Sequence, residues 1–269
     1  MQPTSSLPAF LGVVHLQPLP GSPRFSGDLE AVLSAACRDA EALSSGGAGG
    51  LIVENFGDAP FRPGPVDPET VAAMAVAISR VRAVVGDGLP IGANVLRNDA
   101  RAALGLCACA GASFLRVNVH TGGAHTDQGP IHGRADDTLR QRARLFPSPA
   151  TAPPILADVH VKHASPMADV PIEVAARDAR DRGLADALIV SGTGTGAAVD
   201  TTELATVAAA VPGTPVYIGS GFTPERAQEL LHPTKGATGA IVGTWLKEDG
   251  RLRAPVDVER VRAVAACFS

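Results

Sequence analysis

The chain has 269 residues, of which 45% are hydrophobic and 19% are charged, so it is able to bury a sizeable core. Its 23 basic and 27 acidic side chains give a formal net charge of −4 without any long basic run, which argues against nucleic acid as the main partner. No uncharged apolar stretch reaches the roughly 18 residues of a membrane span, and no charged n-region precedes the first apolar run. The sequence therefore predicts a soluble, cytoplasmic protein.

Short apolar segments rich in β-branched residues alternate with helical segments along the chain. Segments that are apolar nearly end to end are typical of parallel strands covered by helices. Asn98 is the predicted N-cap of one helix, and Gly183 is a predicted C-terminal stop. In chain order the predicted strand–helix pairs are 10–16 with 28–45, 50–56 with 67–85, 91–96 with 99–110, 114–119 with 136–146, 155–163 with 172–182, 187–192 with 201–210, 216–221 with 224–231, and 239–246 with 256–267.

Eight strand–helix pairs predict an α/β fold, a single (β/α)8 TIM barrel over residues 1–269 with a short N-terminal extension at 1–9. A doubly wound open sheet is the alternative, but it usually carries a glycine fingerprint after its first strand, where this chain has QPLPGSP. Nearly all polar residues of the predicted strands lie in their second halves. Because barrel enzymes place their chemistry at the C-terminal ends of the strands, a functional site is predicted at that face.

The segment ILADVHVKHA, residues 155–164, alternates apolar residues with Asp158, His160 and Lys162. On a strand, residues two apart share a face, so these three side chains are predicted to project together at intervals of about 6–7 Å. Lys162 is either a catalytic amine, as a proton carrier or Schiff-base former, or an ion-pair partner of Asp158. His160 is a candidate general acid or base because histidine changes charge near neutral pH.

Polar residues also end the second, third and fourth predicted strands. Glu54 is a second acid–base candidate, with an ion pair to Arg116 or Lys162 as the alternative role. Asn94 and Asn118 suit the binding of substrate hydroxyls, or equally hydrogen bonding inside the barrel. The predicted catalytic residues are thus Lys162, His160, Asp158 and Glu54, and the predicted substrate-binding residues are Asn94, Asn118, Arg116 and His120.

Three loops are rich in glycine and hydroxyl residues, and they follow the sixth, seventh and eighth predicted strands. Glycine lets several backbone N–H groups converge on one anion, and barrels often hold phosphate in the loops after strands seven and eight. Tight turns without a ligand are the alternative reading. The predicted phosphate-binding residues are Ser191, Gly192, Thr193, Gly194, Gly219, Ser220, Gly221, Gly243 and Thr244.

The loop 120–134 is rich in glycine and histidine and is predicted to close over the barrel mouth as a lid. Its histidines at 120, 125 and 132 either ligate a metal ion, with Asp127 or Glu54, or form hydrogen bonds within a polar loop. Neither these histidines nor the four cysteines have the spacing of a standard zinc site. No metal site is therefore assigned and no cofactor is required by the sequence, although a divalent metal stays open.

Six segments together resemble the BtpA family, which includes SgcQ-type proteins: GVVHLQPLPGSP, ENFGDAPF, GANVLRNDA, FLRVNVHTGGAHTDQGPIHG, ILADVHVKHA and IVSGTGTG. The resemblance runs from about Leu11 to Trp245 and implies a barrel of the ribulose-phosphate-binding type. It also implies a link to photosystem I biogenesis, since the family is named after a peripheral thylakoid factor. Other members accompany genes for sugar transport and metabolism, and the resemblance fixes no activity.

Two functions are therefore expected. The first is an enzyme that acts on a phosphorylated sugar or nucleotide-like small molecule by acid–base chemistry, as a lyase, isomerase or hydrolase. The second, implied by the family name, is a non-catalytic assembly or stability factor for photosystem I or another membrane complex. The expected partner is a phosphorylated small molecule, while a homo-oligomer and peripheral association with a membrane complex stay open.

Overall fold

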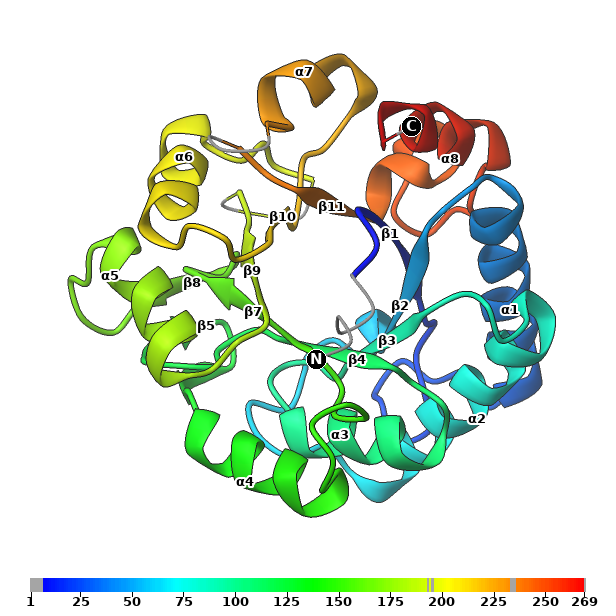
Figure 1. The fold of residues 1–269 in the computed structure, drawn as a ribbon. Coiled ribbons are helices and arrows are strands. Elements are labelled where there is room, and N and C mark those ends of the chain that lie inside the picture. The colour runs from blue at the N-terminus through cyan, green and yellow to red at the C-terminus, as the bar shows by residue number, and fades with distance from the viewer. Residues whose placement is uncertain (1–6, 193, 195, 233–235, 269) are drawn as a thin grey trace.

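The computed structural model describes residues 7–192, 194, 196–232 and 236–268, and its centre is a closed ring of parallel strands (Figure 1). The barrel strands are β1 (Phe10–His15), β2 (Gly50–Glu54), β3 (Ile91–Asn94), β4 (Phe114–Val117), β7 (Ile155–Val159), β9 (Ala187–Val190), β10 (Val216–Ile218) and β11 (Gly239–Val242). They neighbour one another in chain order, and β1 pairs with β11 to close the ring. The predicted (β/α)8 barrel is confirmed.

Helices surround the ring on its outer side (Figure 1). They are α1 (Leu29–Ser45), α2 (Pro68–Val85), α3 (Ala100–Cys109), α4 (Ala135–Leu145), α5 (Ile172–Arg177), α6 (Thr201–Ala210), α7 (Ala227–Leu230) and α8 (Val258–Ala265). Short helical turns are η1 (Phe56–Asp58), η2 (Asp178–Arg182), η3 (Pro224–Arg226), η4 (Thr244–Leu246), η5 (Glu248–Gly250) and η6 (Ala266–Phe268). No helix within the described ranges is long and apolar enough to cross a bilayer.

The cap of α3 lies one residue later than predicted. Asp99 accepts a hydrogen bond from the backbone N–H of Ala102 at 2.9 Å, so the carboxylate caps the helix. Asn98 instead exchanges two hydrogen bonds of 2.8 Å with the backbone of Val119. Asn98 therefore joins the loop after β3 to the loop after β4.

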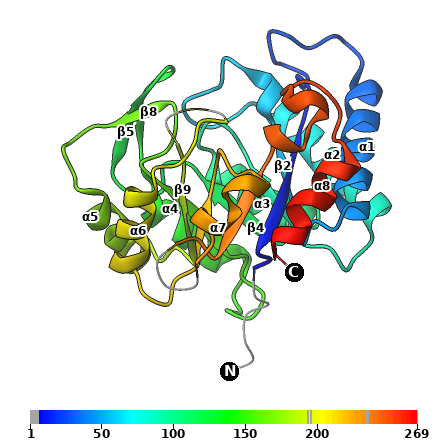
Figure 2. The same cartoon turned by 90° about the horizontal axis from the view of Figure 1, so that it is seen from above.

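The predicted lid is an ordered antiparallel sheet. Its strands are β5 (Gly123–Thr126), β6 (Gly129–His132) and β8 (Ala164–Pro166), in the order β6-β5-β8. Figure 2 shows β5 and β8 at the end of the barrel opposite the start of β1. Strand β8, which follows β7 in the chain, thus pairs with β5 and anchors the loop after β4.

Strand β7 ends at Val159 rather than at residue 163, which corrects the predicted alternation. His160 and His163 have φ angles of 49° and 56°, so the backbone enters the left-handed region twice within four residues. Lys162 accordingly leaves the barrel wall on a turn, and it does not share a strand face with Asp158.

The barrel interior has an apolar floor below a polar layer. Side chains at every second strand position face inward, and in the lower half they form a buried cluster of Leu11, Val13, Ile52, Phe114, Leu156, Ala187, Ile189, Tyr217 and Ile241. One step further towards the C-terminal ends, the same alternation places His15, Glu54, Asn94, Arg116, Asp158 and Ser191. The two-residue alternation of the strands thus places the polar side chains together at the C-terminal mouth of the barrel, above an apolar core.

Candidate functional site

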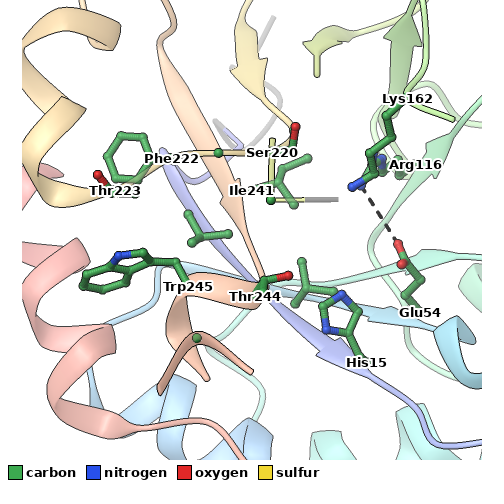
Figure 3. Close-up of a pocket in the computed structure, with 17 residues that line it drawn as sticks. His15, Glu54, Arg116, Lys162, Ser220, Phe222, Thr223, Ile241, Thr244 and Trp245 are labelled. Carbon is green, nitrogen blue, oxygen red and sulfur yellow. Dashed lines mark ion pairs between the residues drawn. The ribbon is translucent and has the colours of Figure 1, made fainter. Parts of the chain in front are cut away.

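One pocket opens at the C-terminal ends of the strands, and it has two unlike sides (Figure 3). The loops after β10 and β11 form one side, which includes the rings of Phe222 and Trp245. Ionisable side chains form the other side: His15 from β1, Glu54 from β2, and Lys162 from the turn after β7. Lys162 and Ser220 therefore line the same pocket, as the predicted site requires.

Arg116 and Asp158 build the wall behind the ionisable side chains. Arg116 donates from Nε and Nη2 to the two carboxylate oxygens of Asp158, each at 2.9 Å. Its Nη1 lies 3.9 Å from Glu54 Oε2 (Figure 3). No ion pair joins Lys162 to a described carboxylate, so the alternative of an Asp158–Lys162 pair is wrong: Arg116 already occupies Asp158.

The pKa values of Lys162 and Glu54 are both shifted towards neutral pH. Burial, and next the charge of Arg116, lower the pKa of the Lys162 ammonium to about 8. Burial raises the pKa of the Glu54 carboxyl, although Arg116 opposes this. Arg97 donates to the backbone oxygen of Lys162 at 2.8 Å and so fixes the turn that carries the amine. The pocket contains both an amine and a carboxyl group that exchange protons nearer to neutral pH than usual.

His15 is a pocket residue to which sequence reasoning assigned no role. Its Nδ1 is buried without a hydrogen-bond partner among the described residues, and its ring centroid lies 4.8 Å from that of Phe56. Burial lowers the pKa of the imidazole well below its ordinary value, and the charges of Lys247 and Lys162 act in the same direction. The sequence did contain a pattern that indicates a pocket position for His15. It ends the first predicted strand and lies two residues after the inward-facing Val13.

The loops after β10 and β11 offer unused backbone donors. No hydrogen bond within the described residues uses the N–H groups of Gly221, Phe222, Thr244 or Trp245. Gly221 has a φ of 70°, a conformation that favours glycine. These donors border the pocket, so the side formed by Gly219–Gly221 and Gly243–Thr244 is suited to an anion.

The loop after β9 does not line the pocket through the predicted residues that the structure describes. Ser191 Oγ lies 3.3 Å from Asp158 Oδ1, behind the pocket wall. The N–H of Gly192 donates to Ser220 Oγ at 2.8 Å, and that hydroxyl donates to Ala197 O at 3.1 Å. Gly194 lies beside the His163 ring, and Thr193 lies outside the described residues. This loop therefore braces the anion side through Ser220.

Four other predicted site residues lie away from this pocket. Asn94 Nδ2 donates to Asn118 Oδ1 at 3.0 Å, so these amides pair inside the barrel. Asn118 and His160 line a neighbouring cavity beside the three-stranded sheet, where His160 Nε2 is buried without a partner among the described residues. His120 Nε2 lies 2.7 Å from Gly183 O, outside the barrel mouth. His160 lies in this neighbouring cavity because β7 ends at Val159, and the turn that follows directs the His160 ring away from the pocket of Lys162.

The histidines of the 120–134 segment do not gather around a common point. His125 and His132 are exposed on β5 and β6, whereas His120 is buried against Gly183. Over the part of the chain that the structure describes, no three His, Cys, Asp or Glu side chains form a cluster that could hold a metal ion. The alternative of hydrogen-bonding histidines accounts for His120.

Comparison with known proteins assigns the chain to a family. The model of the BtpA family matches residues 7–268. The chain belongs to the BtpA family. The photosystem I biogenesis protein BtpA of Synechocystis sp. is 46% identical over 253 residues, which cover 94% of this chain and 85% of that protein. An uncharacterised protein of Thermococcus kodakarensis is 47% identical over 252 residues, covering 94% and 92%. The BtpA resemblance seen in the motifs is thus confirmed.

Solved structures similar to this BtpA-family chain are barrels. Phosphoribosyl anthranilate isomerase from Thermus thermophilus superposes with a TM-score of 0.54 at 16% identity, covering 96% of this chain and 98% of that one. Orotidine 5′-phosphate decarboxylase from Pyrococcus horikoshii gives a TM-score of 0.55 at 15% identity, with the same coverage. Likeness at this level of identity shows the fold alone.

Proposed function

We propose that this BtpA-family protein is an enzyme that binds a phosphorylated small molecule and transforms it by acid–base chemistry. The observation that carries the proposal is the two-sided pocket, whose lining combines Glu54 and Lys162 with loops whose backbone N–H groups have no partner among the described residues. Backbone donors on a preformed glycine-rich loop are able to bind phosphate with little reorganisation. A phosphate held there leaves the rest of the ligand against the ionisable side.

The ionisable side suits proton transfer to and from a sugar-like group. Glu54, with its raised pKa, and Lys162, with a pKa of about 8, supply a proton donor and an acceptor near neutral pH. Isomerisation, aldol cleavage and hydrolysis are the reaction classes that need such a pair. The two superposable barrels named above are named for phosphorylated substrates, which agrees with the proposal while resting on the fold alone.

A thermal-shift screen against phosphorylated sugars and nucleotides, with and without divalent metal, tests the binding. A ligand at 100 times its Kd should stabilise the protein by about 2.7 kcal/mol and raise Tm. With the best binder as substrate, Lys162→Met and Glu54→Gln should each lower turnover by about 100-fold or more, while the exposed His125→Asn should not. The proposal fails if no phosphorylated compound shifts Tm.

A second function is favoured by one observation, the name of the Synechocystis relative, a photosystem I biogenesis protein at 46% identity. On this alternative the chain is a non-catalytic assembly or stability factor. Expression in a cyanobacterium that lacks its own BtpA distinguishes the two. Rescue of photosystem I by Lys162→Met and Glu54→Gln as well as by the unchanged chain favours the assembly factor. Rescue that requires both side chains favours the enzyme.

A further inference from the structure

His15 has a hydrogen-bonding atom that none of the described residues uses. Its Nδ1 is buried without a partner among the described residues, and a buried polar atom of this kind is costly. The residue lines the pocket, so its ring lies at the edge of the space that a ligand would occupy (Figure 3). A ligand that hydrogen-bonds this imidazole would remove the cost on binding.

The strand register places His15 beside Glu54. Residues of β1 and β2 pair in parallel from Leu11 with Gly50 up to His15 with Glu54. Cα partners on neighbouring strands lie about 5 Å apart, and both side chains face the pocket. An atom of the ligand that reaches one of these side chains is therefore within reach of the other.

The space around the His15 ring is closed on the side of β11. A Cβ atom at Gly243 would lie 2.6 Å from His15 Cε1, so only glycine leaves room for the ring in this position. The ring of Phe56 packs on it from the loop after β2. The glycine and the phenylalanine together keep the imidazole in the pocket wall rather than free to swing out.

The charges around His15 keep it neutral. Burial comes first, then Lys247 after η4, Lys162 after β7 and Arg116 on β4, and all of them lower its pKa. Glu54 is the carboxyl on the neighbouring strand. A neutral imidazole has one donor and one acceptor nitrogen, so it is able to hold a carbonyl or hydroxyl oxygen, whereas a phosphate is better served by the donors across the pocket.

We propose that His15 contacts the substrate directly, hydrogen-bonding a carbonyl or hydroxyl oxygen of the phosphorylated compound next to Glu54. This assignment rests on the proposed function, and it narrows the ligand. The compound carries its phosphate at one end and a neutral oxygen, of a sugar or polyol, near the group that Glu54 protonates or deprotonates. His15 positions that oxygen, and Glu54 and Lys162 move the proton.

Calorimetric titration separates the two ends of the ligand. The probes are inorganic phosphate and a panel of phosphorylated aldoses, ketoses and polyols, measured with the unchanged chain, His15→Phe and His15→Asn. His15→Phe keeps a ring but removes the hydrogen bond, so the best phosphorylated compound should bind about three- to tenfold more weakly. Phosphate affinity should stay within about twofold, and His15→Asn should recover part of the loss. Melting temperatures confirm that each variant is folded.

Nuclear magnetic resonance of the histidine ring nitrogens gives an independent readout. The His15 signals should move on addition of the best compound and not on addition of phosphate, while those of the exposed His125 should move with neither. Equal loss of both affinities in His15→Phe, or no loss, overturns the assignment of His15 alone. If the unchanged chain binds neither phosphate nor any member of the panel, the proposed function fails and this assignment fails with it.

Discussion

Arg116 and Asp158 are almost fully buried, with side-chain exposures of 3% and 0%. Each charge is tolerated because the other neutralises it and because hydrogen bonds use the remaining lone pairs. The pair also shapes the site, since Arg116 reaches Glu54 on its other side. A residue predicted to bind substrate and a residue predicted to be catalytic thus form the wall on which the pocket is built.

Removing one partner of this pair should be costly. Arg116→Met leaves Asp158 as an uncompensated buried charge, so the free energy of unfolding should fall by about 3–5 kcal/mol in urea titrations. Arg62→Met, which breaks the exposed pair with Asp67, is the control and should change it by less than about 1 kcal/mol. Equal effects of the two substitutions would contradict the role given to the buried pair.

Lys162 should make stability depend on pH in a defined direction. Its pKa is about 8 in the folded chain against an ordinary value of 10.5. Between these values the unfolded chain binds more protons, so stability should rise as the pH is raised from 8 to 10.5. Urea titrations across this window should show the rise in the unchanged chain and a smaller rise in Lys162→Met. An identical pH dependence in both proteins would show that the folded-state pKa of Lys162 is not lowered.

The sequence was sufficient to predict which face of the barrel carries the polar groups, because strand alternation fixes Glu54, Asp158 and Arg116 as inward-facing. It offered Arg116 as one of two possible partners of Glu54, which the 3.9 Å ion pair confirms, but it did not predict that Arg116 also pairs with Asp158. The partner of Asp158 depends on the packing of β4 against β7. What distinguishes His15 from other strand ends is a buried Nδ1 without a partner in the described part of the chain, which no sequence pattern reveals. The functional roles of these residues stay predictions.

The barrel strands depend on glycine where inward-facing rings need room. Gly92 on β3 faces the barrel interior, and a Cβ atom there would lie 2.2 Å from the Phe114 ring. Gly105 on α3 has nothing within 4 Å of the same position. Gly92 is therefore required by packing, whereas Gly105 only lowers the helix propensity of α3.

Gly92→Ala should lower the free energy of unfolding by about 1–3 kcal/mol, because Phe114 must leave its rotamer or the strands must shift. Gly105→Ala should raise it by up to about 1 kcal/mol, because alanine favours helix. Chemical denaturation of both variants checks the opposite signs. A stabilising Gly92→Ala would show that the interior around Phe114 is looser than the structure describes.

Elements long enough to show a regular period were predictable, and short elements without one were not. The helix 201–210 has the predicted bounds because its cap, Asp200, is local. Strand β8 pairs with β5 across 38 or more residues, and a three-residue strand has too few positions to show a period. The end of β7 was missed for a related reason: a positive φ at His160 leaves no mark on an alternating pattern.

At the scale of the whole molecule, the last residues of the chain pack against its first strand. The ring of Phe268 stacks on Phe10 at 5.7 Å between centroids and lies 5.4 Å from Phe222. Figure 2 shows the C-terminus beside the beginning of β1. Phe222 lines the pocket on the side formed by the loops after β10 and β11, which is the side suited to an anion. The rings of Phe10, Phe268 and Phe222 therefore form a column that connects β1, where the barrel closes, to that side of the pocket.

Phe268→Ala should therefore affect both stability and the pocket. Loss of the two ring contacts should lower the free energy of unfolding by about 1–3 kcal/mol, because a partly buried aromatic ring is removed. The loop of Phe222 then loses its backing, so calorimetry should also find weaker binding of inorganic phosphate. Val84→Ala, a truncation of a side chain that is 41% exposed, controls for the loss of apolar surface and should change stability by less than about 0.5 kcal/mol. Reduced stability with unchanged phosphate affinity would contradict the second part of this prediction. It would mean that the N–H groups of the loops after β10 and β11 keep their positions without Phe268, so that the column stabilises the barrel but does not support the anion side.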